Sequence, residues 1–221
     1  MNAAAERWVV LDVGETLIDE TRIWSAWADA LDIPRLTFLA GLGATLARGG
    51  DYRDVFALFG ATDWDQHADD VEARHGGFRP EDLYPDALRA LDALRRAGYR
   101  IAIIANQPAI RHEQLAALGV RADVMAMSEA LGVAKPAPSF YERIVQLTDA
   151  APDCIVYVGD RVDNDVLPAA AAGMRAVWIR RGPWGIIQEL PPDAVPALVV
   201  DSLDELVERI DEVWSSVPAQ E

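Results

Sequence analysis

The stretch WVVLDVGETLIDE, residues 8–20, decides how this chain folds. Its first four residues are all apolar, with no alternation of polar and apolar positions, as in a strand buried on both faces of a parallel sheet. The run ends at a carboxylate, Asp12, and a glycine, Gly14, follows two residues later. Because a charged group at the end of a buried strand is costly to desolvate, we interpret Asp12 as a functional residue.

Five further apolar runs of strand length lie along the chain, and helical patterns separate them. These runs are also continuous, which is typical of strands buried on both faces. Strands that alternate with helices predict an α/β fold, a three-layer Rossmann-like parallel sheet. Including the first, the predicted strands are 8–13, 101–105, 123–127, 154–158, 176–179 and 197–200.

The alternation is interrupted between residues 18 and 82, where no strand pattern occurs. Glycine and proline divide this insert into four predicted short helices, 21–33, 35–50, 51–60 and 63–77. We expect most of its aromatic residues to form the insert's own core, and one or two to face a cleft. The predicted organisation is a core domain of residues 1–17 and 83–221 with a helical cap of residues 18–82.

Polar side chains follow the predicted strands where the strands end. Asn106 follows the second strand, and the loop after the third contains Lys135, the single lysine beside nineteen arginines. The stretch GDRVDND follows the fourth strand and contains Asp160, Asp163 and Asp165. Parallel sheets bind ligands beyond the carboxyl ends of their strands, so we expect these groups to converge with Asp12. Clustered carboxylates require a cation, and oxygen ligands without histidine or cysteine favour Mg²⁺.

Composition restricts the expected partners and location. The formal net charge of −16 disfavours nucleic acid and anionic membranes as partners. No apolar stretch reaches the roughly 20 residues of a membrane span, and the N-terminus lacks a signal-peptide pattern. A single cysteine, Cys154, indicates a reducing compartment. We therefore expect a cytoplasmic protein, monomeric or homodimeric, whose histidines face solvent: His67, His75 and His112.

The stretches LDVGETL, ANQ, Lys135-Pro136 and VGDRVDND occur in this order, each at a strand end. Together they resemble the four motifs of the haloacid dehalogenase-like (HAD) hydrolases, and the helical insert is similar to the C1-type cap of that family. The resemblance covers residues 7 to about 185. We expect the strand order 3-2-1-4-5, with Asp12 on the central strand.

The resemblance also implies roles for individual residues. Asp12 would be the nucleophile, and Lys135 would neutralise the substrate anion together with Asp12. Thr16 and Asn106 would orient the nucleophile and the transferring group through hydrogen bonds. The implied Mg²⁺ ligands are the carboxylates of Asp12, Asp160 and Asp165 and the backbone carbonyl of Gly14.

Two positions depart from the phosphatases of that family. Those enzymes usually carry a second aspartate two residues after the nucleophile, which protonates the leaving oxygen and later activates water; this chain has Gly14 there. They also usually carry a serine or threonine where this chain has Ala105. General acid–base catalysis typically contributes ~10²–10⁴ in rate, so the first departure matters more, above all for a poor leaving group.

Gly14 leaves three functions open. The first is a Mg²⁺-dependent phosphatase of a small phosphorylated metabolite, with Glu15 and Glu20 as the nearest substitutes for the missing acid. The second is a 2-haloacid dehalogenase, because those family members also lack the second aspartate, although they do not need Mg²⁺. The third is a degenerate member that binds a phosphorylated ligand or a protein without turnover. If the space beside Gly14 is empty, aspartate there would raise activity on poor leaving groups.

Overall fold

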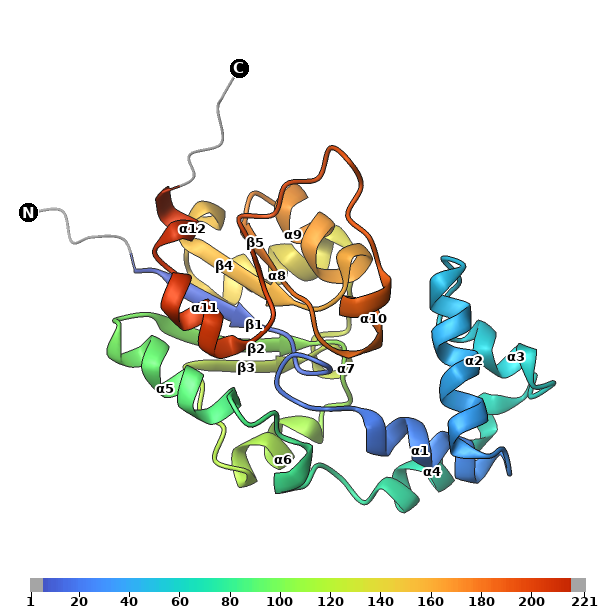
Figure 1. Ribbon diagram of the computed structural model, residues 1–221. Coiled ribbons are helices and arrows are strands. Elements are labelled where there is room, and N and C mark those ends of the chain that lie inside the picture. Colours follow the sequence, from blue (N-terminus) through green and yellow to red (C-terminus); the bar gives the residue numbers. More distant parts are fainter. Residues whose placement is uncertain (1–5, 216–221) are drawn as a thin grey trace, which may run out of the picture.

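The computed structural model describes residues 6–215, so residues 1–5 and 216–221 of the predicted core domain lie outside the described range. Six parallel strands form one sheet in the order β3-β2-β1-β4-β5-β6 (Figure 1). The predicted order is confirmed, and the sixth predicted strand extends the sheet beyond β5. The strands are β1 Trp8–Leu11, β2 Arg100–Ala105, β3 Val124–Met127, β4 Ile155–Gly159, β5 Arg175–Ile179 and β6 Leu198–Val200.

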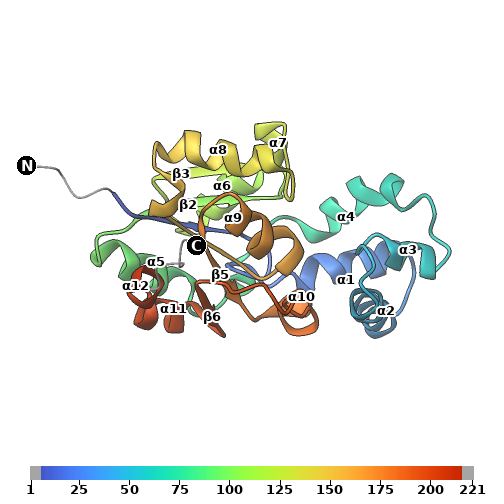
Figure 2. The ribbon, with the colours of Figure 1, turned by 90° about the horizontal axis from the view of Figure 1, so that it is seen from above.

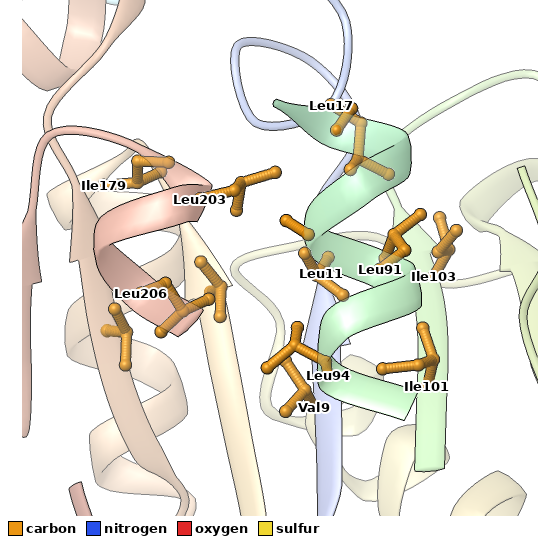
Figure 3. Close-up of a cluster of buried hydrophobic side chains, with 14 of the residues drawn as sticks. Val9, Leu11, Leu17, Leu91, Leu94, Ile101, Ile103, Ile179, Leu203 and Leu206 are labelled. Carbon is orange, nitrogen blue, oxygen red and sulfur yellow. The ribbon is translucent and has the colours of Figure 1, made fainter. Parts of the chain in front are cut away.

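Helices cover both faces of the sheet, because the strands bury side chains on both sides (Figure 2). On one face, Leu11 of β1 shares a buried cluster with Leu94 of α5 (Ala87–Arg96), as Figure 3 shows. On the other face, Val10 shares a cluster with α8 (Pro138–Thr148). The other helices after α5 are α6 Arg111–Ala117, α7 Ser128–Leu131, α9 Leu167–Ala171, α10 Gly182–Ile187, α11 Leu203–Arg209 and α12 Glu212–Ser215.

The position of β1 inside the sheet brings several strand ends together. Leu11 is in register with Ile103 of β2 on one side and with Val158 of β4 on the other. The next residue, Asp12, still belongs to the ladder, since its backbone N–H donates to the carbonyl oxygen of Val158 at 2.9 Å. The residues that follow β1, β2 and β4 therefore meet at one edge of the sheet.

The helices of the insert form their own cluster to one side of the sheet (Figures 1 and 2). They are α1 Thr21–Ala30, α2 Arg35–Ala47, α3 Asp54–Leu58 and α4 Ala68–His75, with a 3₁₀ turn at Trp64–His67. Trp24, Phe38 and Phe56 are buried in their shared core, and Trp184 of α10 packs there with its ring centroid 5.9 Å from that of Trp24. On this basis we propose that residues 18–82 are a cap on the sheet domain.

The observed cap helices are shorter than the predicted ones. Helix α2 ends at Ala47, and Gly49 after it has a φ of 71°. Helix α4 likewise ends before Gly76, whose φ is 65°. Such left-handed conformations end a helix, and glycine adopts them without steric cost. The predicted helix 63–77 is divided into the 3₁₀ turn and α4, so hydrophobic spacing located these helices but did not fix their ends.

No single helix among the described residues is long and apolar enough to cross a membrane. Helices α1 and α2 reach that length and apolar content only as a pair, and they are bent by 112° at the break between them. Within the cap, Ala28 of α1 and Leu42 of α2 are buried in the cluster described above.

One histidine is buried where the cap rejoins the rest of the chain, so the expectation that it faces solvent is wrong. His75, at the end of α4, is only 2% exposed. Arg22 of α1 donates from Nη2 to His75 Nε2 at 3.1 Å and to Asp82 Oδ2 at 2.6 Å. Because a guanidinium group can only donate, the imidazole accepts at Nε2 and is neutral.

The burial of His75 predicts a pH-dependent stability. Burial and the nearby charges of Arg22 and Arg111 lower the pKa of His75 from 6.5 to about 4. Between these values the unfolded chain binds a proton that the folded chain does not, so the free energy of unfolding should fall as the pH falls through this window. The loss should reach at most about 3 kcal/mol near pH 4.

Urea unfolding of the wild type and of His75→Gln at about pH 7 and about pH 5 measures this contribution. The carboxylates titrate in both proteins, so their effect cancels in the comparison. We expect a smaller loss of stability in His75→Gln. His112→Gln, at an exposed histidine, is the matched control and should behave like the wild type. An identical pH dependence in the wild type and His75→Gln would contradict the prediction.

Candidate active site

Three buried carboxylates meet at the edge of the sheet where β1 and β4 end. Asp12 follows β1, Asp160 follows β4, and Asp165 lies on the π-helical turn Val162–Val166. One oxygen of each carboxylate lies within 4.8 Å of the others. Their exposed fractions are only 7%, 2% and 0%. The structure thus brings together the three side chains that the sequence analysis assigns to a metal site.

Lys135 joins this cluster from the segment between α7 and α8. Its Nζ donates to Asp12 Oδ1 at 2.8 Å and to Asp165 Oδ1 at 2.6 Å. Asn106 fixes the lysine backbone, because Lys135 N–H donates to Asn106 Oδ1 at 2.8 Å and Asn106 Nδ2 donates to the Lys135 carbonyl at 3.0 Å. Burial lowers the pKa of Lys135, but the two carboxylates outweigh it and raise the pKa above its usual value, so the amine stays charged.

The loop after β4 sorts its aspartates into two groups. The backbone N–H of Arg161 donates to Asp165 Oδ2 at 3.0 Å, and a Cβ at Gly159 would overlap the Asp165 carboxyl group. Gly159 therefore allows that carboxyl group to lie inside the cluster. Asp163 lies outside the cluster and accepts from Arg161 Nη2 at 2.6 Å and from Gln188 Nε2 at 2.8 Å.

Asp160 is the member of the cluster that lacks a partner. Its Oδ2 atom is buried and has no hydrogen-bond partner among residues 6–215. Burial raises the pKa of Asp160 well above its usual range, and the nearby charges of Asp165 and Asp12 raise it further. A cation among the three carboxylates would bind this free oxygen and relieve the repulsion. The set contains carboxylate oxygens and neither histidine nor cysteine, which fits a hard cation.

Thr16 is a predicted site residue that does not line the cavity beside Asp12. Thr16 is fully buried, and its hydroxyl has no hydrogen-bond partner within the described part of the chain. It does not line the cavity, whereas Asp12, Gly14, Asn106 and Lys135 do. Its carbonyl accepts from Arg181 Nη1 at 3.4 Å. Thr16 therefore contacts the loop before α10 through its backbone.

The space beside Gly14 is not empty, because the carboxyl group of Glu20 occupies it. A Cβ at Gly14 would lie 2.5 Å from Glu20 Oε1 and 2.7 Å from Glu20 Cδ. Gln107, which follows Asn106, donates from Nε2 to Glu20 Oε1 at 3.0 Å. Burial and the charges of Glu15 and Asp12 raise the pKa of Glu20 to about 7. An acidic side chain thus stands next to the loop after β1 although position 14 has no side chain.

Glu15 has a different environment. Both of its carboxylate oxygens are engaged, since Oε1 accepts from the Glu20 backbone N–H at 3.0 Å and Oε2 accepts from the Tyr84 hydroxyl. The start of α10 also comes close, and a Cβ at Gly182 would overlap the Glu15 side chain. Burial raises the pKa of Glu15. These contacts show that Glu15 ties three segments together.

A cavity of about 630 Å³ lies over these groups. Asp12, Lys135 and Asp160 line it, as do the guanidinium-bearing side chains Arg53, Arg111 and Arg161. The cap and α10 contribute the aromatic part of the lining, which consists of Trp24, Trp27, Tyr52, Phe56, Trp64 and Trp184.

Arg111 and Gln107 line the cavity, and the sequence analysis assigned neither of them a role. Arg111 of α6 forms a two-pronged ion pair with Glu72 of the cap helix α4, with nitrogen–oxygen distances of 2.8 and 2.7 Å. Nothing in the sequence distinguishes Arg111 from the other arginines. Gln107 directly follows Asn106, but its hydrogen bond to Glu20 could not be predicted, because Glu20 lies in a segment distant in sequence.

Comparisons with known proteins agree with this geometry. A family model described as haloacid dehalogenase-like hydrolase matches residues 6–173. A phosphoserine phosphatase of Thermus thermophilus is 32% identical over 193 residues, which cover 81% of this chain and 76% of the relative. A glyceraldehyde 3-phosphate phosphatase of Methanopyrus kandleri is 33% identical over 133 residues. That match covers 59% of this chain and only 57% of the relative.

Solved structures share the fold at lower identity. The HAD-hydrolase YfnB of Bacillus subtilis superposes with a TM-score of 0.72 at 16% identity, over 94% of this chain and all of its own. The L-2-haloacid dehalogenase RSc1362 superposes with a TM-score of 0.65 at 18% identity, over 94% of this chain. At these sequence identities the similarity shows a shared fold alone.

Proposed function

The chain belongs to the haloacid dehalogenase-like hydrolases and is an enzyme of that family, and from this we propose that it is a Mg²⁺-dependent phosphatase of a small phosphorylated metabolite. The observation that carries the proposal is the meeting of three buried carboxylates with the buried Lys135. Two relatives named as phosphatases, of phosphoserine and of glyceraldehyde 3-phosphate, support this reaction over other hydrolyses.

In the proposed reaction, a carboxylate oxygen of Asp12 attacks the phosphorus atom of the substrate, and the bond from phosphorus to the leaving oxygen breaks. Water then attacks the phosphorus of the acyl phosphate, which releases inorganic phosphate and restores Asp12. Lys135 Nζ lies 2.8 Å from Asp12 Oδ1, so it would neutralise both the nucleophile and the incoming phosphoryl group. Asn106 would keep the lysine there through its hydrogen bonds to the Lys135 backbone. Thr16 would help to orient the nucleophile through a hydrogen bond.

The residues of the cluster fit a bound Mg²⁺ ion. We assign its ligands to the carboxylates of Asp12, Asp160 and Asp165 and to the backbone carbonyl of Gly14. The free and buried Asp160 Oδ2 atom supports this assignment, because a carboxylate oxygen without a partner is costly in a buried position. When bound, the cation would supply positive charge where the phosphoryl oxygens develop negative charge.

The cavity is of a size that suits a small molecule. Because aromatic side chains line it together with the carboxylate cluster, it would accept a phosphate ester with a partly apolar body. The expectations of a cytoplasmic location, a monomer or homodimer, and no nucleic acid or membrane partner stay predictions.

A 2-haloacid dehalogenase is the second candidate, and Gly14 is the residue that favours it. A departing halide needs no proton, so a dehalogenase does not require a general acid at this position. The buried carboxylate cluster with its free oxygen weighs against this candidate, because a dehalogenase of this family does not need Mg²⁺. A member that binds a phosphorylated ligand or a protein without turnover is the third candidate.

Hydrolysis of p-nitrophenyl phosphate, measured after chelation and again after addition of Mg²⁺, tests the proposal. We expect activity that chelation removes and Mg²⁺ restores, and no chloride release from 2-chloropropionate. Activity that chelation leaves unchanged would contradict the metal site. Chloride release without phosphatase activity would favour the dehalogenase, and Mg²⁺ binding without either reaction would favour a non-catalytic member.

A further inference from the structure

Transfer of a phosphoryl group to Asp12 leaves the departing oxygen in need of a proton, unless the leaving group is already a weak base. Three of the carboxyl groups that line the cavity are paired with arginine side chains, namely Asp51 with Arg53, Glu72 with Arg111 and Asp163 with Arg161. Glu72 is paired with both terminal nitrogens of Arg111. Asp163 accepts from Arg161 and Gln188. These carboxyl groups are already engaged by cationic side chains, so their oxygens are not free to contact a departing oxygen.

The remaining carboxyl groups differ in what binds them. Asp12 is paired with Lys135, and Asp160 belongs to the proposed metal site. Glu15 has both oxygens engaged by Tyr84 and by the backbone of Glu20. Glu20 accepts a single hydrogen bond, at Oε1, and its Oε2 atom has no hydrogen bond or ion pair within residues 6–215.

Glu20 also lies where a proton donor would be needed. It immediately precedes α1, so its backbone belongs to the entry of the cap. Its side chain turns back against Gly14, two residues after Asp12, with the carboxyl oxygens 2.5 and 3.1 Å from the Cβ position that Gly14 leaves free. Glu20 and Asp12 line the same cavity. The carboxyl group therefore fills the space that a side chain at position 14 would take.

We propose that Glu20 is the general acid and base of the hydrolysis, and that Gln107 is the positioning residue that holds it. The inference rests on the proposed phosphatase function. As the phosphorus–oxygen bond breaks and Asp12 becomes phosphorylated, the Glu20 carboxyl group gives its proton to the leaving oxygen. The resulting carboxylate then takes a proton from the attacking water, which forms inorganic phosphate and restores Asp12. Each turnover thus returns Glu20 to its protonated form.

The test compares two substrates that differ in their need for a proton, an alkyl phosphate such as glycerol phosphate and p-nitrophenyl phosphate. Glu20→Gln keeps the shape of the side chain but cannot donate a carboxyl proton. We expect kcat/KM for the alkyl phosphate to fall about 10²–10³-fold and kcat/KM for p-nitrophenyl phosphate to fall less than about tenfold. The value of kcat/KM reports only the steps through the first irreversible one, so it does not report the later hydrolysis of the acyl phosphate. Loss of the base should slow that hydrolysis, and the covalently phosphorylated protein should then accumulate and be detectable by intact mass.

Glu15→Gln is the matched control, since Glu15 is a neighbouring glutamate in the same cavity whose oxygens are both engaged. We expect it to change both substrates by the same factor. Gln107→Ala should lower the alkyl phosphate rate selectively, by less than Glu20→Gln. Equal losses on the two substrates in Glu20→Gln would show a purely structural role and overturn the inference, as would no loss on either.

A second variant uses Gly14 itself. Gly14→Asp alone should give no gain, because its side chain meets the carboxyl group of Glu20. In the double variant Gly14→Asp/Glu20→Ala, the new aspartate has room and should recover alkyl phosphate activity at least about tenfold over Glu20→Ala. A gain from Gly14→Asp alone would overturn the inference. Failure of the wild type to hydrolyse either substrate would instead refute the phosphatase function. Asp12→Asn should lose activity on both substrates if the hydrolysis occurs at this site, whereas failure of the Glu20 inference alone would leave the loss in Asp12→Asn intact.

Discussion

Replacing Asp12 by asparagine is expected to lower kcat/KM for p-nitrophenyl phosphate at least about 10³-fold, while the protein keeps its fold. An amide oxygen is a far weaker nucleophile than a carboxylate oxygen, and it cannot form the acyl phosphate that water hydrolyses. The fold should survive because Lys135 keeps its second partner, Asp165, at 2.6 Å. Thermal unfolding measured beside the kinetics separates lost chemistry from lost structure.

The matched control for this prediction is Asp204→Asn. Asp204 is an aspartate on the surface, paired with Arg89 and 44% exposed at its side chain, outside the cavity. It should keep wild-type kcat/KM. Asp12→Asn activity within about tenfold of the wild type, in a protein free of wild-type contamination, would contradict the role of Asp12 as nucleophile.

Removing the charge of Lys135 is expected to damage both stability and activity. Lys135→Ala leaves two buried carboxylates, Asp12 and Asp165, without their cationic partner. Breaking a buried ion pair from one side costs about 3–5 kcal/mol, which corresponds to roughly 6–20 °C in Tm for a chain of this size. Loss of kcat/KM should exceed about 10²-fold, because the phosphoryl group would meet uncompensated negative charge.

The stability change of Lys135→Ala should depend on the metal. If Mg²⁺ binds among the carboxylates, it also neutralises them, so added Mg²⁺ should raise the Tm of Lys135→Ala by more than that of the wild type. Lys135→Arg is the control, because it retains the charge but changes the geometry of the donor, and it should retain more stability than activity. Equal Mg²⁺ effects on Lys135→Ala and the wild type would contradict a shared site for the lysine and the cation.

The sheet could be predicted from the sequence because its signal is local. A strand covered on both faces must be apolar at consecutive positions, and each of the six predicted runs is a strand in the structure. The candidate site followed from the same signal, since parallel strands end at a common edge and Asp12, Asp160 and Lys135 come after strand ends. Helix ends in the cap were less predictable, because the conformation of Gly49 and Gly76 decides them.

What the sequence could not determine depends on partners that the chain brings together only on folding. The buried His75 contacts Arg22, which also pairs with Asp82, and these two residues lie near the start and at the end of the cap segment. In the sequence, Gly14 indicates that an acidic side chain is missing. In the structure, the turn that follows it, with Glu15 at a φ of 51°, places the carboxyl group of Glu20 beside position 14. By itself the sequence determined the parallel sheet and the carboxylates and lysine at its edge, because strand burial and strand ends are encoded within a few residues. Tertiary structure alone decided which glutamate fills the space beside Gly14, because side-chain direction there depends on a backbone turn and on Gln107 from a distant strand end.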